Sequence, residues 1–156
     1  MRRMKSTHRA PFTTWVILAT AVLFGFRQAG DPPAAHLIQP ADLAGSLAAS
    51  TPDRPPILQI GVQSLYKGAH ITSAIYAGPA STPEGLANLE RAVKNLPRDR
   101  AIVIYCGCCP WDKCPNVRPA YRRLTELGFT KVQVLKLPTN LHTDWVERGY
   151  PVDKSE

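Results

Sequence analysis

The stretch AIVIYCGCCPWDKCP, residues 101–115, joins a short apolar run to a loop that holds all four cysteines of the chain. Residues 101–106 (AIVIYC) are apolar without interruption and rich in β-branched side chains. This pattern predicts a strand that is buried on both faces, as strands of parallel sheets are. Function in such sheets gathers in the loops at the carboxyl ends of the strands, so we expect the cysteine loop to form a functional site.

The segments on either side of this stretch alternate between helical and strand patterns. Helices are predicted over residues 40–50, 82–96, 117–127 and, as a short last element, 141–149. Further strands are predicted over residues 57–62, 73–78 and 131–137. Pro40 suits a first helical position, and Thr82 precedes Pro83 and Glu84 as a helix cap would. The alternation predicts one α/β domain with a parallel sheet.

The net charge of the chain excludes one class of partner. The 156 residues carry a formal charge of +7, but the first 30 hold five of the 19 basic residues and none of the 12 acidic ones. Residues 31–156 therefore have 14 basic and 12 acidic residues, a net charge of +2. That balance is ordinary for a soluble domain, and we expect no nucleic-acid partner.

The N-terminal segment, residues 1–30, has the pattern of a signal peptide or an N-terminal membrane anchor. Its basic start is followed by residues 12–26, an apolar stretch of 15 residues without charge. Such a length lies between a signal-peptide core and a membrane span of about 20 residues. We expect an exported, periplasmic or extracytoplasmic protein that residues 12–26 attach to the membrane if they are not cleaved. Residues 31–36 then form a linker and residues 37–156 the folded domain.

Five pieces of the sequence resemble, in order, the rhodanese-like (sulfurtransferase) domain family. They are LIQPADLAGSL (37–47), ILQIGVQSLYKGAHITSAIY (57–76) with Tyr66, His70, Ile71 and Ala74 in the family signature, IVIYC (102–106), LGF (127–129) and W...GYPV (145–152). The pieces extend over 116 residues. This resemblance implies a central, mostly parallel five-stranded sheet with helices on both faces, and a sulfurtransferase activity.

The sequence departs from the family pattern around the expected site. Gln59 and Gly61 stand where the family usually has Asp and Arg. The cysteine loop is longer than usual, and it holds no arginine between Cys106 and Arg118. LPTN (137–140) replaces the pair of glycines that usually follows the last strand. These changes leave the fold assignment intact and leave the substrate open.

The resemblance places Cys106 at the position of the nucleophile, which attacks a sulfane sulfur and holds it as a persulfide. Inward backbone N–H groups and the start of the next helix would lower the pKa of this thiol. A second thiol can attack the persulfide and release sulfide; Cys109, spaced as Cys-x-x-Cys, is the preferred resolving partner, with Cys108 and Cys114 as alternatives. The rest of the expected substrate loop is Gly107, Cys108, Trp111, Lys113, Cys114 and Arg118, with Lys113 and Arg118 as anion contacts. We expect no cofactor; the expected partners are a small sulfur-containing anion or thiol acceptor and a redox partner protein.

Other interpretations of the loop remain open. Structural disulfides here would close loops of only four to eight residues, which contribute about 2 to 2.5 kcal/mol in the chain-entropy model. A soft-metal site for copper or zinc would use Cys106, Cys108, Cys109 and Cys114. A thiol–disulfide redox protein is the second enzymatic alternative. A cysteine phosphatase is excluded, because no arginine stands six residues after any of the cysteines.

Three aromatic side chains outside the loop have more ordinary expected roles. His70 lies within the resemblance signature and is expected to form structural hydrogen bonds. Trp145 is expected to pack in the core. His142 is expected at the surface, in a last loop that this fold brings toward the cysteines.

Overall fold

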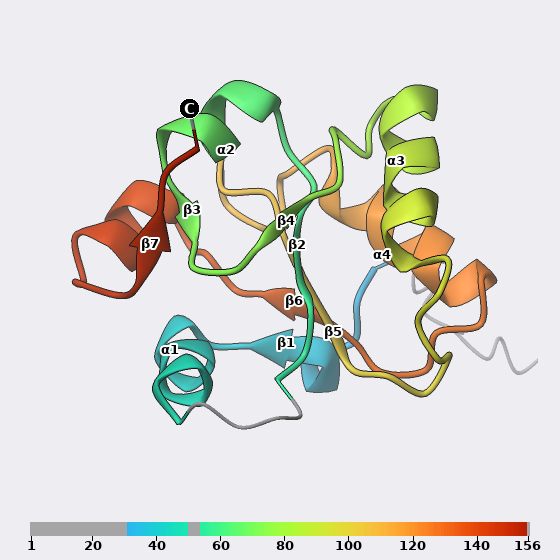
Figure 1. Cartoon of the computed structure of the whole chain (residues 1–156), viewed down its shortest axis with the longest axis horizontal. Helices are drawn as coiled ribbons and strands as arrows, with labels where there is room; N and C mark the ends of the chain where they lie inside the picture. The colour runs from blue at the N-terminus through green and yellow to red at the C-terminus, as the bar shows by residue number, and fades with distance from the viewer. Residues whose placement is uncertain (1–30, 50–53, 156) are drawn as a thin grey trace, which may run out of the picture.

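A computed structural model describes residues 31–49 and 54–155 of the chain (Figure 1). The predicted signal peptide or anchor, residues 1–30, lies outside the described residues. Within the described ranges, no helix combines the length and the apolar character that a membrane crossing requires. In the expected linker, residues 31–36, a 3-10 turn, η1 (Ala34–His36), leads into the first strand, and His36 Nδ1 lies 2.8 Å from Tyr121 Oη.

Five strands form a sheet in which every neighbouring pair is parallel, in the order β1-β6-β5-β2-β4. They are β1 (Leu37–Ile38), β2 (Ile57–Gln59), β4 (Ile75–Tyr76), β5 (Ile102–Tyr105) and β6 (Val132–Leu135). β5 is the central strand, and its Ile104 pairs with Leu58 of β2 and Val134 of β6. The predicted five-stranded parallel sheet is therefore confirmed, with strands shorter than the apolar runs suggested.

Three of the predicted helices are confirmed as α-helices, and the fourth is present as a short π-helical turn. The helices are α1 (Pro40–Ala48), α2 (Gln63–Gly68), α3 (Pro83–Val93) and α4 (Val117–Glu126). Thr82 caps α3 as predicted, because its Oγ1 accepts a hydrogen bond of 3.0 Å from the backbone N–H of Gly85. The helix expected over residues 141–149 is a single π-helical turn, η2 (His142–Val146).

The α2 helix and the two strands β3 and β7 were not predicted from the sequence. α2 begins where the chain leaves β2, so the predicted strand over residues 57–62 ends early, at Gln59. β3 (His70–Ile71) and β7 (Val152–Asp153) form a separate antiparallel pair. This pair ties the C-terminal end of the described chain to the segment that follows α2, next to the candidate site.

The core lies in two layers on the two faces of the sheet. Ile102 and Ile104 of β5 pack with buried side chains of α3 and α4. Val103 and Tyr105, which alternate with them, pack with buried side chains of α1 and η2. Figure 1 shows α3 and α4 together on one side of the sheet and α1 on the other. The prediction of helices on both faces is confirmed, and it explains why β5 is apolar at every position.

Trp145 and His70 have the structural roles that the sequence suggested. Trp145 is fully buried, and its indole N–H donates a hydrogen bond of 2.9 Å to the carbonyl of Pro151. His70 is buried and stacks on Tyr66, and its Nδ1 lies 2.7 Å from the carbonyl oxygen of Tyr66. Both side chains therefore support the packing around the β3–β7 pair.

Candidate active site: a thiol cluster beside a cleft

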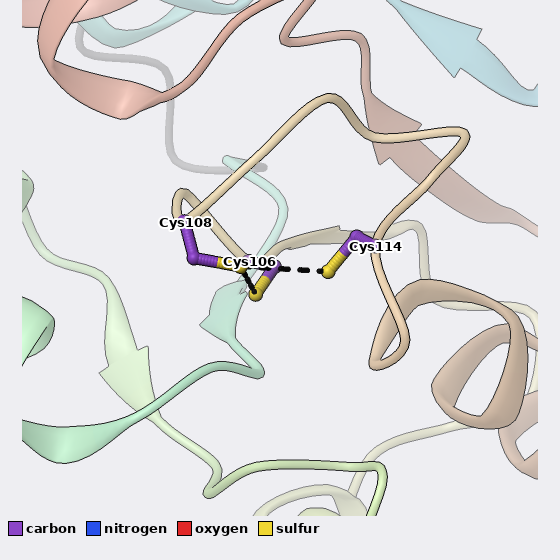
Figure 2. A group of neighbouring side chains, drawn as sticks. All are labelled: Cys106, Cys108 and Cys114. Carbon is purple, nitrogen blue, oxygen red and sulfur yellow. Dashed lines mark hydrogen bonds between the residues drawn. The ribbon is translucent and has the colours of Figure 1, made fainter.

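The loop between β5 and α4 brings its four cysteines into one thiol cluster: Cys106, Cys108, Cys109 and Cys114. The Cys108 sulfur lies 3.2 Å from that of Cys106, 3.0 Å from that of Cys109 and 3.9 Å from that of Cys114. Cys106 and Cys114 are buried, Cys109 is half-buried and Cys108 is exposed; all four thiols are free. Figure 2 shows Cys106 between Cys108 and Cys114 in this view, and dashed lines join the Cys108 sulfur to the other two.

Backbone contacts hold the loop in this shape. Gly107 has a φ of +86°, in the left-handed region that favours glycine, directly after the nucleophile position. Its carbonyl accepts a hydrogen bond of 3.0 Å from the N–H of Leu141, and the N–H of Trp111 donates one of 3.0 Å to the carbonyl of Leu137. The segment that follows β6 therefore anchors the loop at two points.

Asn116 is a site residue that the sequence analysis missed. Its side chain is buried, and its Nδ2 donates to the sulfur of Cys106 at 3.3 Å and lies 3.9 Å from that of Cys114. Its Oδ1 accepts a hydrogen bond of 2.8 Å from the backbone N–H of Ser81. An asparagine directly before a predicted helix was the available signal, but only the fold shows that it faces two thiols.

Gln59 and Gly61, the two departures from the family pattern, both contact Cys106. Gln59 is buried, and its Nε2 donates a hydrogen bond of 3.1 Å to the carbonyl of Cys106. Its Oε1 is buried without a hydrogen-bond partner among the described residues. A Cβ on Gly61 would lie 2.9 Å from both the sulfur and the carbonyl oxygen of Cys106. An arginine at position 61 would therefore displace the thiol, so its absence follows from the position of Cys106.

The ionisation of the cluster differs from the sequence expectation. The pKa of Cys106 is raised, first because its thiol donates a hydrogen bond toward Cys114 and then because it is buried. The pKa of Cys114 is lowered to about 5, chiefly by that same hydrogen bond and also by the backbone N–H of Asn116. The expectation of a lowered pKa at Cys106 is therefore wrong. The backbone N–H of Asn116, at the start of α4, stabilises the thiolate of Cys114 instead. The N–H of Cys108 does face Cys106, but it does not outweigh the other effects.

A titration of the full chain should show this first thiolate. Because the pKa of Cys114 is about 5, the ultraviolet absorbance of thiolates should rise in a step near pH 5 as the pH is raised. Cys114→Ser should remove the step. Cys106→Ala should move it to higher pH, because the Cys106 thiol is the largest cause of the lowered pKa. Cys109→Ser is the matched control and should retain the step; persistence of the step in Cys114→Ser would assign the thiolate to another cysteine.

A cleft of about 490 Å³ opens beside the cluster. Its described lining residues are Gln59, Ser64, Leu65, Gly68, Ala69, Cys106, Gly107, Cys108, Asn140, Leu141, His142 and Val146. Cys106 and Cys108 thus face the cleft, whereas Cys109 and Cys114 lie behind them in the loop. His142 is exposed, as expected, and the fold brings it to the rim of the same cleft.

The other predicted loop residues do not line the cleft. Trp111 is half-buried and packs against the core layer of α3 and α4. Lys113 is exposed, and Arg118 is exposed and forms an ion pair with Asp31. The structure therefore does not bring the two expected anion contacts, Lys113 and Arg118, to the sulfur of Cys106.

Comparisons with known proteins agree with this architecture. The sequence profile of one family, the rhodanese-like domain, matches residues 40–137. The Alr3790 protein of Anabaena sp. superposes with a TM-score of 0.59 at 25% identity, over 75% of this chain and 82% of that one. The BH2092 protein of Bacillus halodurans has a TM-score of 0.59 at 21% identity, over 77% of each chain. None of the curated proteins matches this sequence significantly.

A larger protein contains the same fold. A thiosulfate sulfurtransferase of Pseudomonas aeruginosa superposes with a TM-score of 0.58 at 23% identity. The superposition covers 81% of this chain and 21% of that one. At such identity the likeness shows a shared fold, and the active residues have to be argued from the site itself.

Proposed function

This chain belongs to the rhodanese-like domain family, and on that premise we propose that it is a sulfurtransferase that carries sulfur as a persulfide on Cys106. The observation that carries the proposal is the position of Cys106, directly after the central strand and facing a cleft of about 490 Å³. Cys106 and Cys108 are the two thiols among the described lining residues of this cleft, so a sulfur donor there comes directly against the cluster. The fold likeness to a thiosulfate sulfurtransferase supports the same reaction class.

The cluster supplies the proton transfer that the reaction needs. The Cys106 thiol passes its proton to the Cys114 thiolate while its sulfur attacks the sulfane sulfur of the donor. The S–S bond of the donor breaks, and the leaving group departs with the electron pair. Cys106 then carries the persulfide, and Asn116 Nδ2, which is 3.3 Å from the Cys106 sulfur in the resting site, stabilises negative charge on it.

The persulfide can be resolved within the loop. A Cys108 thiolate attacks the inner sulfur of the Cys106 persulfide, the S–S bond of the persulfide breaks, and sulfide leaves with the electron pair. The product is a Cys106–Cys108 disulfide, which an external thiol or a redox partner protein then reduces. The sequence suggested Cys109 for this step. The 3.2 Å between the sulfur atoms of Cys106 and Cys108 favours Cys108.

Single serine variants distinguish the two candidate resolving thiols. Cys108→Ser is expected to take up sulfur but to release sulfide at least about tenfold more slowly, because the nearest attacking thiol is gone. Cys109→Ser, its neighbour in the loop, is the matched control and should release sulfide at nearly the normal rate. Sulfide is measured after removal of excess donor. The opposite pattern would make Cys109 the resolving residue.

The proposed function is tested by the mass of the intact chain after exposure to several sulfur donors. Thiosulfate, benzenethiosulfonate and the persulfide of 2-mercaptoethanol cover donors of different charge. With at least one of them we expect one added sulfur atom per chain, transient in the unmodified protein until sulfide is released and persistent in Cys108→Ser, and its removal by dithiothreitol. If none of these donors adds sulfur to the reduced protein, the sulfurtransferase assignment fails.

A soft-metal site is a second candidate function, and one observation favours it. The sulfur atoms of Cys106, Cys108 and Cys114 all lie within 4.8 Å of one another. Thiolates are the ligands that Cu(I) prefers, and three of them suit trigonal coordination. We expect one Cu(I) per chain in competition with a chelator, and loss of at least about tenfold in affinity in Cys114→Ser. Stoichiometric binding without sulfur uptake supports this function, and the absence of tight binding excludes it.

We also propose that the domain works outside the cytoplasm, in a compartment that is oxidising for its thiols. The support is the basic and apolar sequence of residues 1–26. A fusion of the full chain to alkaline phosphatase, which is active only after export, should be active. Deletion of residues 12–26 should abolish that activity, and an active deletion variant would contradict export by this segment.

A further inference from the structure

The cleft beside Cys106 lacks fixed charge. No lysine, arginine, aspartate or glutamate occurs among its described lining residues. The ionisable groups there are Cys106, Cys108 and His142. The Nε2 of His142 lies 3.3 Å from the carboxylate of Glu147, so a proton on this ring is balanced locally. A dianion entering the cleft therefore finds no net positive charge among these residues to replace its hydration.

The walls of the cleft suit an organic molecule. Leu65, Ala69, Leu141 and Val146 supply apolar surface around the sulfur of Cys106. A volume of about 490 Å³ lies in the range of pockets that hold organic ligands and cofactors. A small inorganic anion would fill little of this space and would leave the apolar walls in contact with water.

Gln59, one of the lining residues, supplies an unsatisfied acceptor. Because its Nε2 donates to the carbonyl of Cys106, the orientation of the amide is determined and Oε1 is the end without a partner. This oxygen is buried, with Gln59 only 1% exposed, and has no partner among the described residues. A persulfide in its protonated form, R–S–SH, has a proton to donate to such an acceptor. Thiosulfate has only acceptor atoms, which Oε1 repels.

We propose that the sulfur donor of this domain is a persulfide of an uncharged or singly charged organic thiol, and that thiosulfate is a poor donor. The inference rests on the proposed sulfurtransferase function and specifies its substrate class. Cys106 attacks the outer sulfur of R–S–SH, the donor S–S bond breaks, and the thiolate R–S⁻ leaves with the electron pair. The proton of Cys106 passes to Cys114, so atoms and charge balance without a further reactant.

The test compares the rates at which the reduced full chain takes up sulfur from three donors. They are thiosulfate, benzenethiosulfonate and the persulfide of 2-mercaptoethanol. Benzenethiosulfonate carries a single charge and an apolar ring. Each rate is divided by the rate of the same donor with free N-acetylcysteine, which removes differences in intrinsic reactivity. The two organic donors should exceed thiosulfate by at least about a hundredfold on this scale.

A charge placed on the cleft wall gives a second, independent readout. Leu65 lines the cleft from α2 and is 40% exposed, so Leu65→Arg should fold and should speed uptake from thiosulfate at least about tenfold. Ile75→Arg is the matched control, because Ile75 is 47% exposed on β4 and is not a lining residue. It adds the same charge and should leave the rate unchanged.

The outcomes separate this inference from the proposed function. If normalised uptake from thiosulfate equals that from the organic donors, or if Leu65→Arg leaves thiosulfate uptake at the level of Ile75→Arg, the proposed substrate class is wrong while the sulfurtransferase function stands. If no donor loads sulfur, the function fails and the inference fails with it. Faster organic donors together with a response confined to Leu65→Arg support both.

Discussion

Cys106→Ser should abolish sulfur uptake, with the rate falling at least about a thousandfold for every donor. A serine hydroxyl at this position is protonated at neutral pH and is a far weaker nucleophile than sulfur. Cys109 and Cys114 cannot take its place, because they do not line the cleft. The measurement is the donor-dependent rate of sulfur uptake, followed by the mass of the intact chain.

Two controls make this result specific. Cys109→Ser changes a thiol of the same cluster and should take up sulfur at a near-normal rate. Because Cys106 is only 4% exposed, the thermal unfolding of Cys106→Ser should be compared with that of the unmodified chain, to show that the variant folds. Normal uptake in a folded Cys106→Ser, with loss of uptake in Cys108→Ser, would transfer the role of nucleophile to Cys108.

Gly85→Ala is expected to lower the free energy of unfolding by more than about 3 kcal/mol. Gly85 lies in the first turn of α3, where a Cβ would be 1.9 Å from the carbonyl oxygen of Pro79 and 2.4 Å from its carbon. Both atoms belong to the backbone, so relief requires α3 or the preceding loop to move. That movement would also disturb the cap from Thr82 to the N–H of Gly85. Urea denaturation at equilibrium measures the effect.

Gly45→Ala is the matched control, because Gly45 lies in α1 and a Cβ there meets no atom within 4 Å. Alanine is the better helix former, so this variant should be more stable by about 0.5–1 kcal/mol. The opposite signs of two identical substitutions would show that contacts decide the result, and not glycine replacement itself. A Gly85→Ala variant within about 0.5 kcal/mol of the unmodified chain would contradict the expected close approach.

The parts of the fold that were predicted correctly depend on local patterns. The run at residues 102–105 is apolar at every position because both of its faces are covered, and this pattern is visible without knowledge of its neighbours. Thr82 and Pro83 likewise indicate the start of α3 from adjacent residues alone. The α2 helix was missed because it is short, and the β3–β7 pair because its two short strands lie far apart in the sequence.

The candidate site, like the fold, was predicted only in part from the sequence. That all four thiols occupy one loop after a buried strand follows from the order of residues 101–115. Which thiol is ionised does not, because the pKa of each depends on distances between sulfur atoms and on which backbone amide faces which sulfur. The pKa of Cys114 is lowered chiefly by the Cys106 thiol and then by the backbone N–H of Asn116, so the anion resides on Cys114 and not on the thiol at the strand end.

The order of residues alone thus determined a parallel α/β sheet, its central strand and a thiol-rich loop at the end of that strand. Only the tertiary structure determined which residues line the cleft, because its walls come from α2, the cysteine loop and η2, which are far apart along the chain. Charge, volume and hydrogen-bonding capacity of a cleft are properties of surfaces in contact. A linear pattern records the residues, but the chain has to fold before those surfaces exist.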